Sequence, residues 1–246
     1  MFVNEKIISI EKKENDSLRY DITIKDNNNF FANNILVHNC QNLPEYFELL
    51  KGISFEASEK LDGSSMTVYF KDDYMGVCSR NLDLSFSEDN SYWKTAKNLN
   101  FESRFLAFNE TLWKLGISKN LAFQGELCGP GIQKNPLGLL EVDFYLFNIW
   151  NIDTRGYVTP SLRNLILDGL NSIDSKKIKQ VPIIDSNVKV FDQFTTMDSL
   201  LKFADGKSLL NPSKMREGIV FKSTELYNGT VTMFKAISNE YLLENE

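Results

Sequence analysis

The chain has 246 residues, of which 42% are hydrophobic and 24% charged, a composition typical of a globular protein with a sizeable core. Its net charge of -6 argues against a surface coated in basic residues, although a few clustered cations would still hold phosphates at one site. Three scattered cysteines exclude a disulfide framework, and no apolar segment reaches the roughly 18 residues that cross a bilayer. We therefore expect an intracellular, cytoplasmic protein, of viral or phage origin, with no membrane partner.

The first part of the chain, residues 7–40, predicts short strands. Apolar and polar residues alternate there, and turns rich in Asn and Asp separate the runs, which indicates a small all-β piece. A larger α+β domain begins at Leu43, with a short helix after Pro44. Three strands then follow, over residues 54–63, 64–73 and 74–81.

The rest of the domain alternates between helices and strands. Trp93, Phe105 and Leu112 belong to a set of apolar residues at helical spacing, which predicts one helix over residues 91–115 that packs on the core. Residues 142–150 are almost continuously apolar, as expected of a buried strand. The other predicted elements are strands over residues 121–129, 216–223 and 230–238, a loop over 130–138, and helices over 160–180 and 196–204.

Lys60, Asp62 and Gly63 form the first motif with chemical content. A lysine between a strand and a glycine turn can point its amine into a cleft, although one KxDG sequence is weak evidence because most lysines are solvated. Further short motifs follow in the same domain: Ser79-Arg80-Asn81, Gly125-Glu126-Leu127, Phe144-Tyr145-Leu146-Phe147, Arg216 to Lys222, and Phe234-Lys235. Their order and spacing resemble the covalent nucleotidyltransferase superfamily of ligases and capping enzymes.

These residue types suit the transfer of a nucleotide. An amine that attacks the α-phosphate of ATP must be partly deprotonated, which positive neighbours or desolvation favour. Lys235, Lys222 and Arg80 are candidate neighbours, and the same cations would neutralise charge that develops on the phosphate.

Acidic and aromatic residues would complete a nucleotide site. Glu217 would hold a divalent metal, Mg²⁺ or Mn²⁺, directly or through water, and Glu126 would bind the ribose or a metal-bound water. The ring of Phe147 would stack on adenine. Together with the lysines, these residues predict a site for ATP and a divalent cation.

Within this superfamily the chain is most similar to ATP-dependent RNA ligases, in particular those with an N-terminal OB-type domain before the catalytic domain. The similarity covers about residues 41 to 244 and rests on QNLPEYFELLKG, EKLDGSSMTVYF, CSRNLDL, GELCGPGIQKN, REGIVFKS and FKAISNEYLL. It implies an α+β fold for residues 40–246, namely an ATP-grasp-like nucleotidyltransferase domain of antiparallel sheets with flanking helices.

The same resemblance implies the reaction and its residues. Lys60 would take AMP from ATP and pass it to the 5′-phosphate of RNA, and a 3′-hydroxyl would then attack to seal the strand. Arg80 would contact the substrate phosphate. The catalytic residues it implies are Lys60, Lys235, Glu217, Glu126 and Arg80; the residues around ATP are these five with Glu59, Asp62, Gly63, Phe147 and Lys222; and the metal ligands are Glu217 and Glu126.

Two positions depart from the family pattern. Many relatives have Asp after the stacking aromatic and a Lys-x-Lys pair in the last motif. Here Asn148 follows the aromatic, and Met233 and Ile237 flank Lys235. The sequence also ends soon after Lys235, which favours an RNA ligase over DNA ligases and capping enzymes, because both have a further domain there.

The front of the chain resembles a different family. YDITIKDNNNFFANNILVHNC is similar to the C-terminal end of an intein, in which two strands present a penultimate His, a terminal Asn and a following Cys. Here these are His38, Asn39 and Cys40, and His38 is the single histidine of the chain. A histidine common in that block is replaced by Asn28 or Asn29.

The intein resemblance implies a splicing reaction. Cys40 would take the upstream acyl chain from a thioester, Asn39 would cyclise to cleave its own peptide bond, and His38 would assist by proton transfer. Residues 1–39 have about the length of the C-terminal half of a split intein. The predicted partner is therefore a second polypeptide that carries the N-terminal intein half and the OB-type domain of the ligase, a domain type that commonly binds nucleic acid.

Other interpretations stay open. The chain could be an RNA-end-binding fragment that accepts AMP but does not seal until it is spliced. It could be a DNA ligase or a capping guanylyltransferase, which labelling with ATP against GTP would separate, or it could have a purely structural role. The sequence does not distinguish a nicked duplex, a single strand or a DNA-templated RNA as the substrate.

Several conspicuous residues fit structural roles. Cys78 and Cys128 lie in strand or turn contexts with no His or Cys at metal spacing, so we expect packing thiols and no zinc site. Lys176, Lys177 and Lys179 form a basic patch at a helix end, which we expect to be solvated or to interact with the helix dipole.

Overall fold

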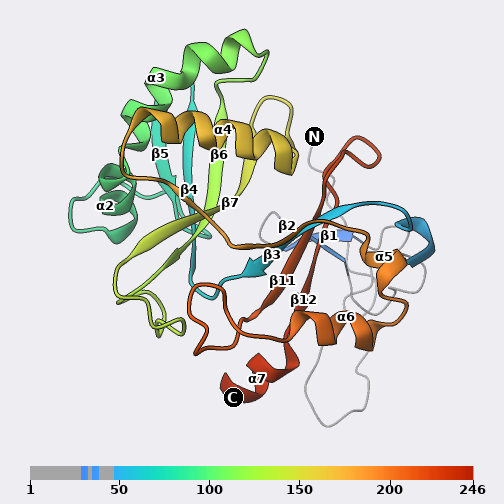
Figure 1. The fold of residues 1–246 in the computed structure, drawn as a ribbon. Helices are drawn as coiled ribbons and strands as arrows, with labels where there is room; N and C mark the ends of the chain where they lie inside the picture. The colour runs from blue at the N-terminus through green and yellow to red at the C-terminus, as the bar shows by residue number, and fades with distance from the viewer. Residues whose placement is uncertain (1–28, 33–34, 39–46, 246) are drawn as a thin grey trace, which may run out of the picture.

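The computed structural model describes residues 29–32, 35–38 and 47–245 (Figure 1). Two antiparallel sheets form the body of the described chain, and helices cover the outer side of each one. The predicted α+β fold of antiparallel sheets with flanking helices is therefore confirmed. No helix in these ranges is both long enough and apolar enough to span a membrane.

The smaller sheet has four strands in the order β10-β3-β11-β12. Strand residues alternate between its faces, so Phe55 and Ala57 face an apolar core while Ser58 and Lys60 face the other way. Two short helices close that core. The elements are β3 (Phe55–Lys60), β10 (Ile183–Val188), β11 (Gly218–Ser223), β12 (Met233–Ile237), α5 (Val190–Gln193) and α6 (Met197–Ala204).

The larger sheet has six strands, five of them in the order β5-β4-β6-β7-β8, with β9 parallel to β7. A tight turn joins β4 to β5, and its residues Asp72 and Asp73 both have positive φ values of 50° and 63°, as two-residue hairpin turns require. The strands are β4 (Ser64–Lys71), β5 (Tyr74–Cys78), β6 (Leu121–Cys128), β7 (Asp143–Asn151), β8 (Gly156–Tyr157) and β9 (Lys179–Gln180).

Helices α2 (Ser91–Asn98), α3 (Phe101–Lys114) and α4 (Pro160–Ile173) pack on the larger sheet (Figure 1). Helix α4 begins where the Thr159 hydroxyl accepts a hydrogen bond from the Leu162 amide (3.4 Å), and proline follows as its first residue. Each sheet therefore has a core of its own, with the cavity-facing residues between the two.

Two predicted helices are shorter than expected. The single helix predicted over residues 91–115 is wrong, because Asn100 adopts the left-handed conformation (φ 52°, ψ 38°) and separates α2 from α3. Asn tolerates this conformation better than most residues, and the apolar spacing continues across the break. The helix predicted over 160–180 ends at Ile173, since Asp174 is extended and β9 begins at Lys179.

The other predicted elements agree more closely with the structure. Residues 196–204 form α6 with a capping box between Thr196 and Ser199, and the two predicted C-terminal strands are β11 and β12. Residues 47–49 are helical, within the short helix expected after Pro44. A last helix, α7 (Asn239–Asn245), follows β12.

The described residues before this domain form a hairpin. Strands β1 (Asn29–Ala32) and β2 (Ile35–His38) pair antiparallel, and His38 lies opposite Asn29 in the register. Asn39 and Cys40, the other two residues of the predicted splice junction, lie outside the described residues.

Candidate active site

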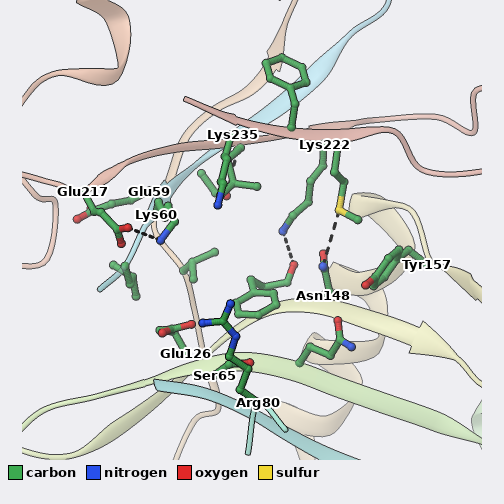
Figure 2. Close-up of a pocket in the computed structure, with 18 of the residues that line it drawn as sticks. Glu59, Lys60, Ser65, Arg80, Glu126, Asn148, Tyr157, Glu217, Lys222 and Lys235 are labelled. Atoms are coloured by element: carbon green, nitrogen blue, oxygen red, sulfur yellow. Dashed lines mark hydrogen bonds and ion pairs between the residues drawn. The ribbon is translucent and has the colours of Figure 1, made fainter. Parts of the chain in front are cut away.

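The site lies where the two sheets meet. Lys60 ends β3 in the smaller sheet, and Leu61, Asp62 and Gly63 lead directly into β4 of the larger sheet. Gly63 is required here for a close approach, since a Cβ at this position would lie 2.4 Å from the Leu127 carbonyl oxygen. The crossing borders a cavity of about 1630 Å³ that residues of both sheets line (Figure 2).

The Lys60 amine forms an ion pair with Glu217. Its Nζ lies 2.5 Å from Glu217 Oε1, and both side chains are largely buried, with 25% and 19% exposed. The strand register brings them together, because Gly218 of β11 lies opposite Lys60. The sequence led us to expect cations beside this amine, whereas the partner that contacts it is a carboxylate.

Glu126 faces the same place from the larger sheet. The pKa of its carboxyl is raised to about 7, mainly by burial: the charge of Lys60 lowers the pKa, and the charges of Glu217 and Asp62 raise it. Figure 2 shows Glu126 across the cavity from the strand that carries Lys235. Three carboxylates, of Glu126, Glu217 and Asp62, and the Lys60 amine thus line one cavity and are close enough for the charges of the other three groups to shift the pKa of Glu126.

Two observations fit a divalent cation at this point. Glu217 Oε2 is buried and has no hydrogen-bond partner among the described residues. The pKa of Glu126 is raised, and a bound cation would stabilise its charged form. Within the described ranges no three His, Cys, Asp or Glu residues form a ready metal cage. A cation between Glu217 and Glu126 would complete its coordination with phosphate oxygens and water, as Mg²⁺ commonly does.

Two further lysines project from the smaller sheet on the same side as Lys60. Lys235 of β12 lies opposite Val220 and is exposed to the cavity, while Lys222 of β11 is buried. Burial, together with the nearby charge of Arg163, lowers the pKa of Lys222 to about 7. Figure 2 shows both lysines entering the cavity from one side.

Aromatic and amide groups form the opposite wall. The ring of Phe147 lines the cavity and lies 5.7 Å from Lys222 Nζ. The next residue, Asn148, directs its Nδ2 toward Met233 Sδ at 3.7 Å and so links β7 to β12. Asn148 and Met233, which belong to the two motifs that depart from the family pattern, are thus in contact with each other.

Arg80, Asp62 and Glu59 also border the cavity. Arg80 is exposed beyond the end of β5, on the Glu126 side (Figure 2). Asp62 Oδ2 accepts a hydrogen bond from the Tyr241 hydroxyl (2.5 Å). The Glu59 carboxylate faces away from Lys60 by strand alternation, is buried, and accepts a hydrogen bond from the Leu209 amide (2.8 Å).

Sequence reasoning missed several residues that support this site. Arg163 is fully buried on α4 and pairs with Glu56, and Tyr241 of α7 holds Asp62. A usable signal for Arg163 was its place at helical spacing with Ile166 and Leu170, because a charge on an apolar stripe requires a buried partner.

Of the residues expected to be structural, the two cysteines and Lys177 fit that role, whereas Lys179 lies on β9, away from the helix end, and forms an ion pair with Asp143 at 2.5 Å. Burial raises the thiol pKa of Cys128 and raises that of Cys78 to about 11, which makes both poor nucleophiles. Lys177 donates to the carbonyls of Asn171 (2.5 Å) and Asp174 (3.1 Å) at the end of α4, as a basic residue near a helix C-terminus does.

Comparisons with known proteins agree with the fold and the motifs. The family model for RNA ligase matches residues 53–237, so the chain belongs to the RNA ligase family. A structure of a Naegleria gruberi RNA ligase variant with ATP and Mn is similar, with a TM-score of 0.73 and 38% identity over 88% of this chain and 59% of that one. A variant of the same ligase with AMP and Mn has a TM-score of 0.72 and 39% identity, over 88% and 60%.

The chain therefore spans about 60% of the length of these ligases. A search among curated proteins finds no significant match. The match confirms the RNA ligase family that the sequence predicted.

Proposed function

We propose that this domain is the adenylyltransferase unit of an ATP-dependent RNA ligase, with Lys60 as the residue that carries AMP. The observation that supports this most is the Lys60 amine, held 2.5 Å from Glu217 in a cavity with acidic groups on one side and Lys235 on the other. The Naegleria gruberi ligase, whose structures contain ATP or AMP with Mn, has the same fold.

The chemistry has three balanced steps. The Lys60 ammonium first loses a proton to solvent, its amine then attacks the α-phosphorus of ATP, a phosphoramidate bond forms, and pyrophosphate leaves. An oxygen of the RNA 5′-phosphate then attacks the same phosphorus, and the lysine is released. In the last step a 3′-hydroxyl attacks the activated 5′-phosphate, and AMP leaves as the phosphodiester forms.

The residues around Lys60 have separate tasks in these steps. Glu217 and Glu126 hold Mg²⁺ or Mn²⁺, which neutralises negative charge on the phosphates. Lys235 adds a second positive charge near the α-phosphate, and Arg80 binds phosphate at the cavity edge. Phe147 stacks on adenine. The remaining nucleotide-site residues are Glu59, Asp62, Gly63 and Lys222.

Labelled ATP tests this assignment directly. The purified chain is incubated with ATP labelled in the α-phosphate and with Mg²⁺ or Mn²⁺, and label on the denatured protein is measured for the wild type, Lys60→Ala and Lys51→Ala. Lys51 is an exposed control lysine. We expect label on the wild type and Lys51→Ala only; label on Lys60→Ala would reject Lys60, and label from GTP in place of ATP would indicate a capping enzyme.

A fragment that accepts AMP but does not seal is the second candidate. The chain spans only 59% of the ligase it resembles. An OB-type domain, which commonly binds nucleic acid, would add RNA binding to the domain described here. Sealing of a 5′-phosphorylated nick by the chain alone separates the two: ligated product supports the complete activity, and lysyl-AMP without ligated product supports the fragment.

We also propose that residues 1–39 are the C-terminal half of a split intein and that residues 40–246 are the ligase domain that splicing joins to the partner's ligase segment. The hairpin of β1 and β2 ends at His38, immediately before Asn39 and Cys40, and the RNA ligase match begins only at residue 53. The partner is a polypeptide with the N-terminal intein half and the N-terminal ligase domain.

Mass spectrometry tests the splicing proposal. In the presence of a complementary N-terminal intein half, we expect a product that joins the partner's ligase segment to Cys40, together with a released fragment of residues 1–39. Asn39→Ala should abolish release of the fragment, because it removes the cyclising amide. An intact chain under these conditions would reject the intein assignment and leave the ligase assignment unaffected.

A further inference from the structure

Strand β7 contains a bulge at Phe147. In its pairing with β6, Asn148 lies opposite Gln124 and Leu146 lies opposite Gly125, which leaves Phe147 without an opposite residue. A β-bulge bends its strand and re-aims the side chain at that point, and bulges are frequent next to active sites. The ring that lines the cavity is therefore the ring of the bulged residue.

The backbone of the bulge is held from outside its own sheet. The Phe147 carbonyl oxygen accepts hydrogen bonds from Lys222 Nζ (2.5 Å) and Arg163 Nη1 (3.3 Å). Lys222 belongs to the smaller sheet and Arg163 to α4, so two separate elements meet at this one carbonyl group.

A buried ion pair fixes Arg163 in turn. Its guanidinium donates two hydrogen bonds to Glu56, at 2.8 and 2.6 Å, and both side chains are almost fully buried. Glu56 lies on β3, in the strand that ends with Lys60, and is opposite Lys222 in the register. Neither Glu56 nor Arg163 lines the cavity, so any effect they have on a ligand acts through Phe147 or Lys222.

A buried ion pair contributes little net free energy to the contact between two sheets. The desolvation of two buried charges often exceeds their attraction, and well-packed apolar residues can replace such a pair without loss of stability. What apolar residues cannot supply is a directed hydrogen bond to the Phe147 carbonyl. The ion pair therefore has a use that packing alone does not explain.

We propose that Glu56, Arg163 and Lys222 are positioning residues that hold the bulge and thereby aim the Phe147 ring at the base of ATP. This rests on the proposed function. The ion pair of Glu56 and Arg163 raises the affinity for ATP and leaves the rate of attack by Lys60 unchanged, because neither residue lines the cavity.

The chain offers a matched control in a second buried arginine. Arg104 is also fully buried, donates to the Leu170 carbonyl (3.3 Å) and Asn171 Oδ1 (3.1 Å), and lies 3.6 Å from Asp174. None of these four residues lines the cavity. Arg104→Lys should therefore lower the melting temperature without a change in ATP affinity.

The test measures the Kd of ATP and the single-turnover rate of adenylylation at saturating ATP. Arg163→Lys should raise the Kd about fivefold, the worth of one well-placed aromatic contact, while the single-turnover rate stays within about twofold. In a Phe147→Leu background the same substitution should change the Kd by less than about twofold, since the ring it positions is gone.

A second variant separates positioning from folding. Glu56→Met combined with Arg163→Met replaces the ion pair with apolar side chains, so the protein should keep its cooperative unfolding while ATP binding weakens as in Arg163→Lys. This variant also provides the measurement if Arg163→Lys does not fold.

The outcomes distinguish the two levels of the proposal. Two results would overturn the positioning role alone, provided that the wild type binds ATP. The first is a Kd for ATP in the apolar double variant that equals that of the wild type. The second is a full fivefold effect of Arg163→Lys in the Phe147→Leu background. A wild type that neither binds ATP nor accepts label would overturn the proposed function and this inference with it.

Discussion

The two sheets of the domain contribute different chemistry to one site. The smaller sheet carries the amines, with Lys60 and Lys235 facing the cavity and Glu217 beside them. The larger sheet carries the acid Glu126 and the ring of Phe147. Each sheet also buries its apolar face in a core of its own. We therefore expect the proposed activity to depend on how the sheets are held together, and stability to depend mainly on the core within each sheet.

Few contacts make the connection between the sheets. The Glu56–Arg163 ion pair and the hydrogen bond from Lys222 to the Phe147 carbonyl cross it, and Asn148 reaches Met233 from the other side. A small apolar cluster lies beside the crossing loop and consists of Leu61, Cys128, Leu137, Tyr145 and Val181. Substitutions at these contacts should change activity out of proportion to stability.

The largest effect is expected at the ion pair of the smaller sheet. Glu217→Gln removes the charge that contacts the Lys60 amine and one of the two carboxylates proposed to hold metal, so adenylylation should fall by about 100-fold or more. Single-turnover labelling measures it. Glu225→Gln, on the exposed segment after β11, is the control and should label at the wild-type rate. Equal rates for both variants would remove Glu217 from the mechanism.

The crossing loop itself should be sensitive to one methyl group. Gly63→Ala places a Cβ 2.4 Å from the Leu127 carbonyl oxygen and 2.7 Å from Cys128 Sγ, which pushes the sheets apart at a cost of about 2–3 kcal/mol in the free energy of unfolding. Gly156→Ala is the control, because its nearest neighbour would be 3.9 Å away, and should change stability by less than about 0.5 kcal/mol. Urea unfolding gives both values, and equal values would show that the crossing is not tightly packed.

Two groups on opposite sheets should give stability a minimum near pH 7. The pKa of Glu126 rises from 4.5 to about 7 on folding, so the native state binds more protons than the unfolded state and stability falls as pH rises through this window. The pKa of Lys222 falls from 10.5 to about 7, so stability rises again between pH 7 and pH 10. At about 1.4 kcal/mol per pKa unit, the free energy of unfolding should change by about 3 kcal/mol on the acidic side and by about 5 kcal/mol on the basic side, as measured by urea unfolding.

Substitution separates the two limbs of this profile. Glu126→Gln should flatten the acidic limb and leave the basic limb in place, and Lys222→Met should do the reverse. A single substitution that flattens both limbs would mean that the two groups titrate as one coupled system.

The motif residues could be predicted from the sequence because each lies at a strand end or on a short strand whose alternation is visible. Lys60, Glu126 and Glu217 were expected at one site, and the structure brings them together. The bulge at Phe147 could not be predicted, because one extra residue leaves no mark in the nearly continuous apolar run of β7.

Long-range partners were equally hidden. Arg163 and Glu56 are 107 residues apart, and helical spacing shows only that a buried charge needs some partner. The break between α2 and α3 was missed for a related reason, because Leu99 and Phe101 continue the apolar pattern on both sides of Asn100. The periodicity of apolar residues shows which face of a helix or strand is buried. A backbone break that keeps the same face buried does not change this periodicity, so the sequence pattern does not reveal it.

The smallest expected effect is at the C-terminal helix α7, which contacts the loop that connects the two sheets. Tyr241→Phe removes only the hydroxyl that donates to Asp62, in the loop from β3 to β4, so unfolding should become easier by about 1 kcal/mol and adenylylation slower by less than about tenfold. Ser118→Ala is a control, because its hydroxyl also donates to a carboxylate, Asp153, at 2.5 Å but neither residue lines the cavity, and it should leave adenylylation unchanged. A loss in Tyr241→Phe as large as that in Glu217→Gln would mean that the position of Asp62 limits the reaction, and that α7 belongs with the two sheets as a part of the active site.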